Sequence, residues 1–150
     1  QPVGRNRGMA LEESQSLLLE MVVVRSRPFV QYLRPLLEKH YGASGPAWEP
    51  ENVYRTLTRV QRTPVRVDAD ELTYPAHIMV RYELEKRILG GDLKVADLPA
   101  AWNELMEARL GVTPTGDVDG CLQDVHWAVG SFGYFPSYAI GTLVAAQLWE

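Results

Sequence analysis

The chain has 150 residues, a size that suffices for a single domain with a substantial core. Apolar residues make up 46% and charged residues 23%, and the net charge of −4 argues against nucleic acid as a partner, because phosphate binding needs a basic face. No apolar run approaches the roughly 18 residues of a membrane span, and no secretory signal pattern is present. The single cysteine, Cys121, fits a reducing compartment, so we expect a cytoplasmic protein with no membrane partner.

The first part of the chain is rich in helix-forming residues. Ala, Leu, Glu, Gln and Met dominate residues 9–24, which predicts a helix there. Pro28 marks a break or the first turn of a second helix, which is expected to run to about His40 or Tyr41. A short helix is then expected over residues 50–54.

A small β-hairpin is predicted next. Residues 55–67 alternate and are rich in Thr, Val and Arg, which is typical of two short strands joined by a turn. A helix over residues 70–89 should follow, because Asp68 and Glu71 have the spacing of a capping box. Pro75 interrupts this helix and predicts a kink.

Two further helices complete the predicted fold, one over about residues 99–110 and one that begins near Pro136. The expected architecture is mainly α, a multi-helix domain with one small β-hairpin, and residues 1–150 are treated as a single domain. The chain begins at Gln1 instead of Met and stops at Glu150 inside an apolar helical pattern without a Gly or Asn cap. We therefore expect an incomplete piece of a longer protein.

Polar and chemically capable side chains gather in the octet Gly-Cys-Leu-Gln-Asp-Val-His-Trp at residues 120–127. An amide, a carboxylate and an imidazole lie close together beside a large indole, and burying them costs free energy unless each finds a partner. The glycine-rich and aromatic segment at residues 130–138 is of a kind that presents side chains to a cleft. The alternative interpretation of His126 is a satisfied core histidine next to a packed aromatic corner.

The octet resembles the G-x-x-Q-D-x-H-W signature of the metallocarboxypeptidases of the carboxypeptidase Taq type. Residues 65–70, Val-Arg-Val-Asp-Ala-Asp, look like that family's I-R-x-x-A-D, and residues 12–16, Glu-Glu-Ser-Gln-Ser, look like its H-E-S-Q-S. Three separated motifs in the family's order make the resemblance specific, and it runs along essentially the whole chain. It nevertheless covers only part of the family's sequence.

The resemblance implies a fragment from the C-terminal half of a larger all-α metallopeptidase fold. The parent would be a zinc-dependent carboxypeptidase that releases C-terminal amino acids by metal-activated water. Its partners would be peptide substrates with a free C-terminus, and family members look like homodimers, so a homo-oligomer is expected.

The resemblance makes Glu13 a zinc ligand of the parent, the carboxylate supplied after the family's H-E-x-x-H helix. The alternative is that Glu12 and Glu13 are solvated acids at a helix start. Glu12 stands where the family has a histidine, which adds negative charge beside the site. The chain contains no H-E-x-x-H, and its only histidines are His40, His77 and His126. We therefore expect the isolated chain to bind no catalytic zinc and to hydrolyse no peptide.

Arg66 is the candidate anchor for the substrate's terminal carboxylate, because a guanidinium can donate two parallel hydrogen bonds to it. Asp70, with Asp68, is expected either to orient Arg66 in substrate binding or to cap the following helix. The alternative interpretation of Arg66 is a strand arginine paired with nearby acids.

His126 and Tyr134 are the candidate catalytic groups, because each can donate a hydrogen bond to the oxyanion that forms during hydrolysis. Tyr138 lies one helical turn beyond Tyr134 and is expected to share that face in substrate binding. Gln123 is a further candidate for the substrate-binding site, and Gln123 and Asp124 are expected to orient these groups rather than to react.

The predicted helix at 70–89 has one mixed face, interpreted as a packed surface with a buried ion pair. That face carries Tyr74, His77, Ile78, Arg81 and Glu85.

Three functional interpretations stay open. The chain is a fragment of a carboxypeptidase, a non-catalytic helical scaffold or interaction module derived from that family, or an unrelated helical interaction domain with coincidental motifs. A fold without adjacency among Glu13, Arg66 and His126 would favour the last of these.

Overall fold

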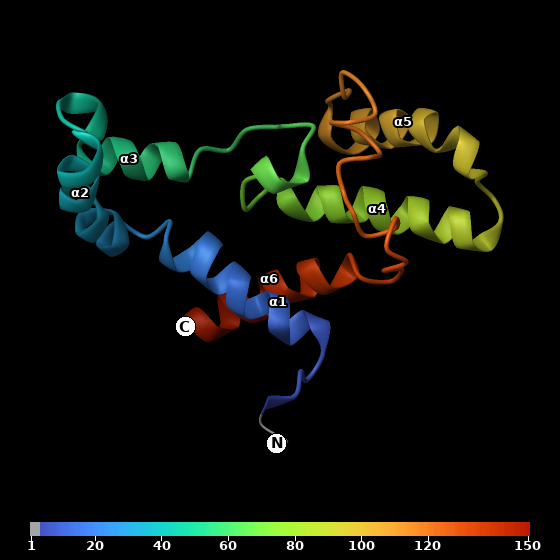
Figure 1. Ribbon diagram of the computed structural model, residues 1–150, viewed down its shortest axis with the longest axis horizontal. Helices are drawn as coiled ribbons and strands as arrows, with labels where there is room; N and C mark the ends of the chain where they lie inside the picture. Colours follow the sequence, from blue (N-terminus) through green and yellow to red (C-terminus); the bar gives the residue numbers. More distant parts are fainter. Residues whose placement is uncertain (1–3) are drawn as a thin grey trace. The chain divides into compact units, whose positions relative to one another are not determined.

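The computed structural model describes residues 4–150, and the chain divides into two compact units. Unit 1 comprises residues 1–59 and 141–150, and unit 2 comprises residues 60–140. Every regular element of the described residues is helical, which confirms the mainly α architecture (Figure 1). No helix in this part of the chain combines the length and the apolar character that crossing a membrane requires. A single domain over residues 1–150 stays a prediction.

Unit 1 begins with α1, Met9–Leu17, which continues into a π-helical segment, Leu18–Val23. The wider turn is visible in the bond from the Val24 N–H to the Leu19 carbonyl, 2.9 Å long and five residues back. These two segments together match the helix predicted over residues 9–24. A π-helical stretch inside a helix is uncommon and shifts the side chains after it around the axis.

The second helix of unit 1, α2 (Arg27–Tyr41), starts where Pro28 predicts a start. The Ser26 hydroxyl accepts a hydrogen bond from the Phe29 N–H at 3.3 Å and caps the first turn. Gly42, with φ of 64°, ends the helix in the left-handed conformation that glycine adopts without strain.

The third helix, α3 (Pro50–Leu57), lies beside α2 (Figure 1). The Arg27 guanidinium stacks 3.9 Å above the centre of the Tyr54 ring and donates to Glu51 at 3.2 Å. This exposed pair joins the two helices at their first turns.

The C-terminal helix, α6, spans Pro136–Trp149 and begins where its proline predicts. Its residues from Gly141 onwards belong to unit 1 and approach α1 closely. A methyl group on Gly141 would lie 3.1 Å from both the Ala10 carbonyl oxygen and the Glu13 Cβ. The glycine therefore allows contact between α1 and α6 that any larger residue would hinder.

Unit 2 is built on α4 (Tyr74–Gly90) and α5 (Leu98–Leu110), which run side by side in opposite directions (Figure 1). Apolar side chains from the facing surfaces form its core, with Trp102, Met106, Val80 and Leu84 among the most buried. Helix α5 begins one residue before the predicted range of about residues 99–110 and ends at the predicted residue.

The predicted β-hairpin at residues 55–67 is wrong. Its first residues belong to α3, residues 59–65 are irregular, and Arg66–Asp68 form a 3₁₀ turn. Side chains take the place of a strand partner, since the Gln61 N–H donates to Asp70 Oδ2 at 2.8 Å and the Arg66 N–H donates to Gln123 Oε1 at 2.7 Å. An alternating pattern predicts a strand only where a neighbouring strand is available to pair with it.

The predicted start of α4 is also wrong. The helix begins at Tyr74, so Pro75 lies in its first turn and produces no kink. Asp70, in place of the expected pair Asp68 and Glu71, organises the entry: its Oδ1 accepts the N–H groups of both Leu72 and Thr73 at 2.9 Å. An aspartate bonded to the backbone that follows it makes a turn before the helix.

Candidate functional site

Two arginines share one carboxylate in the interior of unit 2. Asp124 Oδ1 accepts Nε of Arg66 at 3.0 Å and its Nη2 at 2.8 Å, while Oδ2 accepts Nε of Arg81 at 2.6 Å. The exposed fractions of these side chains are 10% for Arg66, 9% for Asp124 and 0% for Arg81. Arg66 comes from the 3₁₀ turn, Arg81 from α4 and Asp124 from the octet, so the cluster joins three distant segments.

The charges of this cluster do not cancel. Burial alone would raise the pKa of Asp124, but the positive charges of Arg81 and Arg66 hold it below its usual range. Burial lowers the pKa of Arg81 to about 10, which leaves it protonated at neutral pH. Among the described residues, no second carboxylate forms an ion pair with either arginine. Two guanidinium groups and one carboxylate therefore leave one buried positive charge.

Gln123 fixes the backbone around this cluster. Its Oε1 accepts the Arg66 N–H and Nη2 of Arg81, both at 2.7 Å. Its Nε2 faces the carbonyl oxygens of Pro64, Asp119 and Gly120 at 3.1, 2.8 and 3.0 Å. The amide can satisfy both sets only with its oxygen toward the arginines and its nitrogen toward the carbonyls.

Aromatic rings surround the Arg66 guanidinium. Its Cζ lies 4.9 Å from the centre of the Tyr138 ring, and its Nη1 donates to the Tyr74 hydroxyl at 3.2 Å. His126 Nε2 is 3.1 Å from the Tyr138 hydroxyl, and His126 Nδ1 is 3.9 Å from Asp124 Oδ1. The His126 and Tyr134 ring centres are 5.4 Å apart. The structure thus brings together Arg66, Gln123, His126, Tyr134 and Tyr138, which are five of the seven predicted site residues.

Asp70, another predicted site residue, is buried and accepts hydrogen bonds from nearby segments of the backbone. Its carboxylate accepts the N–H groups of Gln61, Leu72 and Thr73 and the Thr73 hydroxyl. Burial would raise the pKa of Asp70, but these hydrogen bonds lower it below its usual value. Arg66 has Asp124 as its carboxylate partner instead, and a substrate contact of Asp70 stays a prediction.

Glu13 lies in unit 1, on α1, whereas Arg66 and His126 lie in unit 2. The Ser16 hydroxyl is 2.9 Å from the Glu13 carbonyl oxygen and 3.2 Å from its Oε2. Over residues 4–150, no three His, Cys, Asp or Glu side chains come together as a metal site. One carboxylate does not make a zinc centre, so the donors of this chain do not fit a complete site.

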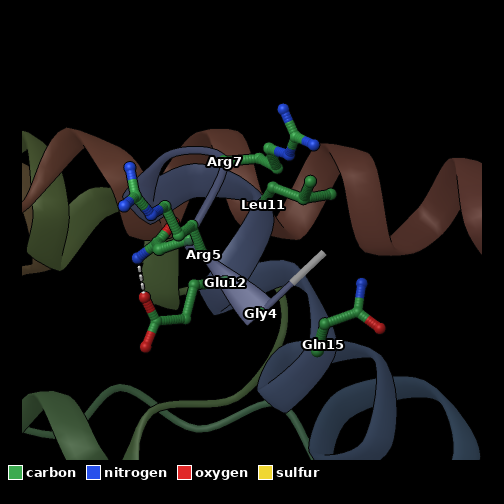
Figure 2. Close-up of a pocket in the computed structure, with 7 residues that line it drawn as sticks. Gly4, Arg5, Arg7, Leu11, Glu12 and Gln15 are labelled. Atoms are coloured by element: carbon green, nitrogen blue, oxygen red, sulfur yellow. Dashed lines mark hydrogen bonds between the residues drawn. The ribbon is translucent and has the colours of Figure 1, made fainter. Parts of the chain in front are cut away.

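Glu12 borders a separate open pocket of about 510 Å³ at the start of unit 1, shown in Figure 2. Asn6 donates a hydrogen bond from its side chain to Glu12, and Arg5 and Arg7 line the same pocket. The acid that replaces the family's histidine therefore lies among basic side chains at the surface.

The face of α4 that the sequence singled out is buried as expected. Its ion pair, however, runs from Arg81 to Asp124, 43 residues away, and not along the helix. Sequence reasoning missed the part of Arg81 in the cluster, and it missed that Glu85 accepts hydrogen bonds from Trp127 Nε1 and the Gly133 N–H. The sequence does contain a signal for these roles. His77, Arg81 and Glu85 recur at intervals of four residues and so share one face of a helix that has few other buried polar side chains.

The chain is similar to known proteins along almost its whole length. The sequence profile of the family described as Carboxypeptidase Taq (M32) metallopeptidase matches residues 1–150. Carboxypeptidase 1 of Bacillus subtilis is 45% identical over 143 residues, and the match covers 93% of this chain and 28% of that protein. Thermostable carboxypeptidase 1 of Pyrococcus furiosus is 40% identical over 99% of this chain and 30% of its own length.

A solved structure, Trypanosoma cruzi metallocarboxypeptidase 1, superimposes with a TM-score of 0.88 and 45% identity. The match covers 99% of this chain and 31% of that protein. The chain therefore spans less than a third of the length of these relatives.

Proposed function

Because this chain belongs to the carboxypeptidase Taq (M32) metallopeptidase family, we propose that it forms part of a zinc-dependent carboxypeptidase that releases C-terminal amino acids from peptides. Glu13 would supply one carboxylate ligand, and the other ligands would come from outside these 150 residues. A divalent metal in such an enzyme supplies an activated water. The chain alone would hydrolyse no peptide, because it lacks H-E-x-x-H. Homo-oligomeric assembly and a cytoplasmic location stay predictions.

The observation that carries the proposal is the uncompensated charge at Arg66. Three of its N–H groups are used, two by Asp124 and one by Tyr74. A guanidinium has five N–H donors, so one remains on each terminal nitrogen. Two N–H groups and one surplus positive charge in a buried cluster suit the carboxylate of a free peptide C-terminus.

The aromatic groups next to Arg66 would act at the scissile bond. Tyr138 is held by His126, and Tyr134 lies against the same imidazole. We assign His126 and Tyr134 the role of hydrogen-bond donors to the developing oxyanion, and Tyr138 a substrate contact. Gln123 and Asp124 would keep Arg66 in place rather than touch the reacting atoms.

The test compares wild-type full-length protein, loaded with zinc, with its Arg66→Lys variant. A lysine loses the paired geometry, so KM for a peptide with a free C-terminus should rise roughly 10- to 100-fold, the equivalent of one charge-assisted hydrogen bond. The same peptide with an amidated C-terminus should be a poor substrate of both proteins.

Arg62→Lys is the matched control, because Arg62 lies on the same loop but is exposed. It should leave KM unchanged, and thermal melting should show that both variants fold. An unchanged KM in folded Arg66→Lys would refute the anchoring role. A zinc-loaded wild type that cleaves no peptide would favour the non-catalytic module instead.

A further inference from the structure

Glu85 is a buried carboxylate that the proposed chemistry does not use. It is 4% exposed on α4, and it accepts hydrogen bonds from two neutral donors, Trp127 Nε1 at 2.7 Å and the Gly133 N–H. Within residues 4–150, no Lys, Arg or His forms an ion pair with it. A buried acid without a cation costs free energy that an apolar side chain would not. Filling the core therefore does not explain its presence.

The two hydrogen bonds of Glu85 hold the two ends of one turn. The turn runs from Trp127 to Gly133 and is closed internally by the Gly130 N–H on the Trp127 carbonyl at 3.1 Å. Gly133 has φ of 75°, a conformation that other residues rarely adopt. Glu85 thereby fixes the distance between the indole at one end and the backbone amide at the other.

The residues just outside the turn are His126 and Tyr134. His126 directly precedes Trp127, Tyr134 directly follows Gly133, and the Ser131 N–H bonds back to the His126 carbonyl at 2.8 Å. Both side chains meet at a ring-centre distance of 5.4 Å. Their relative placement follows from the backbone that Glu85 holds.

We propose that Glu85 is a positioning residue that sets His126 and Tyr134 relative to each other for the reaction. The inference rests on the proposed function, which gives those two side chains their part at the scissile bond. Arg66 is held separately, by Asp124 and Gln123, and neither of these contacts Glu85 among the described hydrogen bonds. A change at Glu85 should therefore alter kcat and leave the binding of the substrate carboxylate largely intact.

The experiment uses Glu85→Gln in the full-length, zinc-loaded protein. Glutamine has the same shape, but its amide nitrogen cannot accept, so one of the two donors loses its partner. We expect kcat to fall at least about tenfold with KM changed less than about threefold, because a displacement near 1 Å is enough for such a loss. The Trp127 indole N–H signal in a proton–nitrogen NMR spectrum should move, since its acceptor has lost its charge.

Glu83→Gln is the matched control. Glu83 lies two residues earlier on α4, at the surface, paired with Arg109 at 3.0 Å. It should leave kcat, KM and the Trp127 signal unchanged. Wild-type kcat in folded Glu85→Gln, or a change confined to KM, overturns the positioning role.

A second variant covers the case in which Glu85→Gln does not fold. Trp127→Phe removes the indole donor and keeps the hydrogen bond from the Gly133 N–H to Glu85. A folded Trp127→Phe protein with a lowered kcat supports the inference, and one with the wild-type kcat overturns it. An inactive wild type overturns the proposed function and this inference with it. An active wild type with a harmless Arg66→Lys refutes only the anchoring role of Arg66, and the result for Glu85→Gln still decides the positioning role. An active wild type with a defective Arg66→Lys and a normal Glu85→Gln overturns the positioning role alone.

Discussion

His77 makes the stability of this protein depend on pH. It is fully buried on α4, and burial, followed by the charges of Arg81 and Arg66, lowers its pKa from the ordinary 6.5 to about 4. Asp124 opposes this shift but does not outweigh it. The folded protein therefore binds fewer protons than the unfolded chain between these two values. Stability is lost as the pH falls below about 6.5 and levels off below about 4.

The size of the effect follows from the two pKa values. The gap between 6.5 and about 4 corresponds to about 3 kcal/mol in the free energy of unfolding, of which about 2 kcal/mol falls between pH 7 and pH 5. His77→Leu removes the titrating group and fills a similar volume. The variant should therefore lose about 2 kcal/mol less than the wild type over that interval.

Urea unfolding of the full-length protein at pH 7 and pH 5, followed by tryptophan fluorescence, measures this difference. His40→Gln is the control, because it removes an exposed histidine on α2 and should keep the wild-type pH dependence. Other titrating groups contribute equally to all three proteins and cancel in the comparison. Equal losses in the wild type and in His77→Leu would refute the assignment of the effect to this buried imidazole.

Two further substitutions test the cluster and the turn that carries it. Asp124→Asn leaves the guanidinium groups of Arg66 and Arg81 buried without a counter-charge, and should lower stability by about 3–5 kcal/mol; an unchanged melting temperature would contradict this. Gly120→Ala places a methyl group 2.7 Å from the backbone carbonyl of Gly116, and should cost about 1–3 kcal/mol in urea unfolding. Gly116→Ala, whose methyl group has only a side-chain oxygen at 4.0 Å, should stay within about 0.5 kcal/mol of the wild type.

Local signals predicted the helices well. Pro28 and Pro136 each mark a true helix start, because proline fixes a backbone angle that suits the first turn and lacks only a hydrogen bond that this turn does not make. Pro75 obeys the same rule, and its predicted kink was wrong only because the helix was started four residues too early. The error came from an aspartate: Asp70 bonds forward to the backbone and makes a turn, where the pattern indicated a cap at Asp68.

The sequence indicated which side chains belong to the cluster, but not which hydrogen bonds and ion pairs join them. The motifs around Arg66 and His126 named most of the side chains that the structure gathers in unit 2. Their partners could not be predicted, because the bond between Arg81 and Asp124 spans 43 residues and the one between Arg66 and Gln123 spans 57. No local pattern encodes a pairing over such a separation. The irregular segment before α4 was missed partly for the same reason, since Gln123 binds the backbone of Pro64 and Arg66 from 59 and 57 residues away.

The orientation of a single amide restricts which residue can occupy position 123. Its nitrogen faces three carbonyl oxygens, while its oxygen faces the Arg66 N–H and Arg81. Glutamate is isosteric, but it would turn an electron-rich oxygen toward those three carbonyls and repel them. The segment that bears Arg66 therefore tolerates a carboxamide at position 123 and rejects the corresponding acid, although the two positions are 57 residues apart.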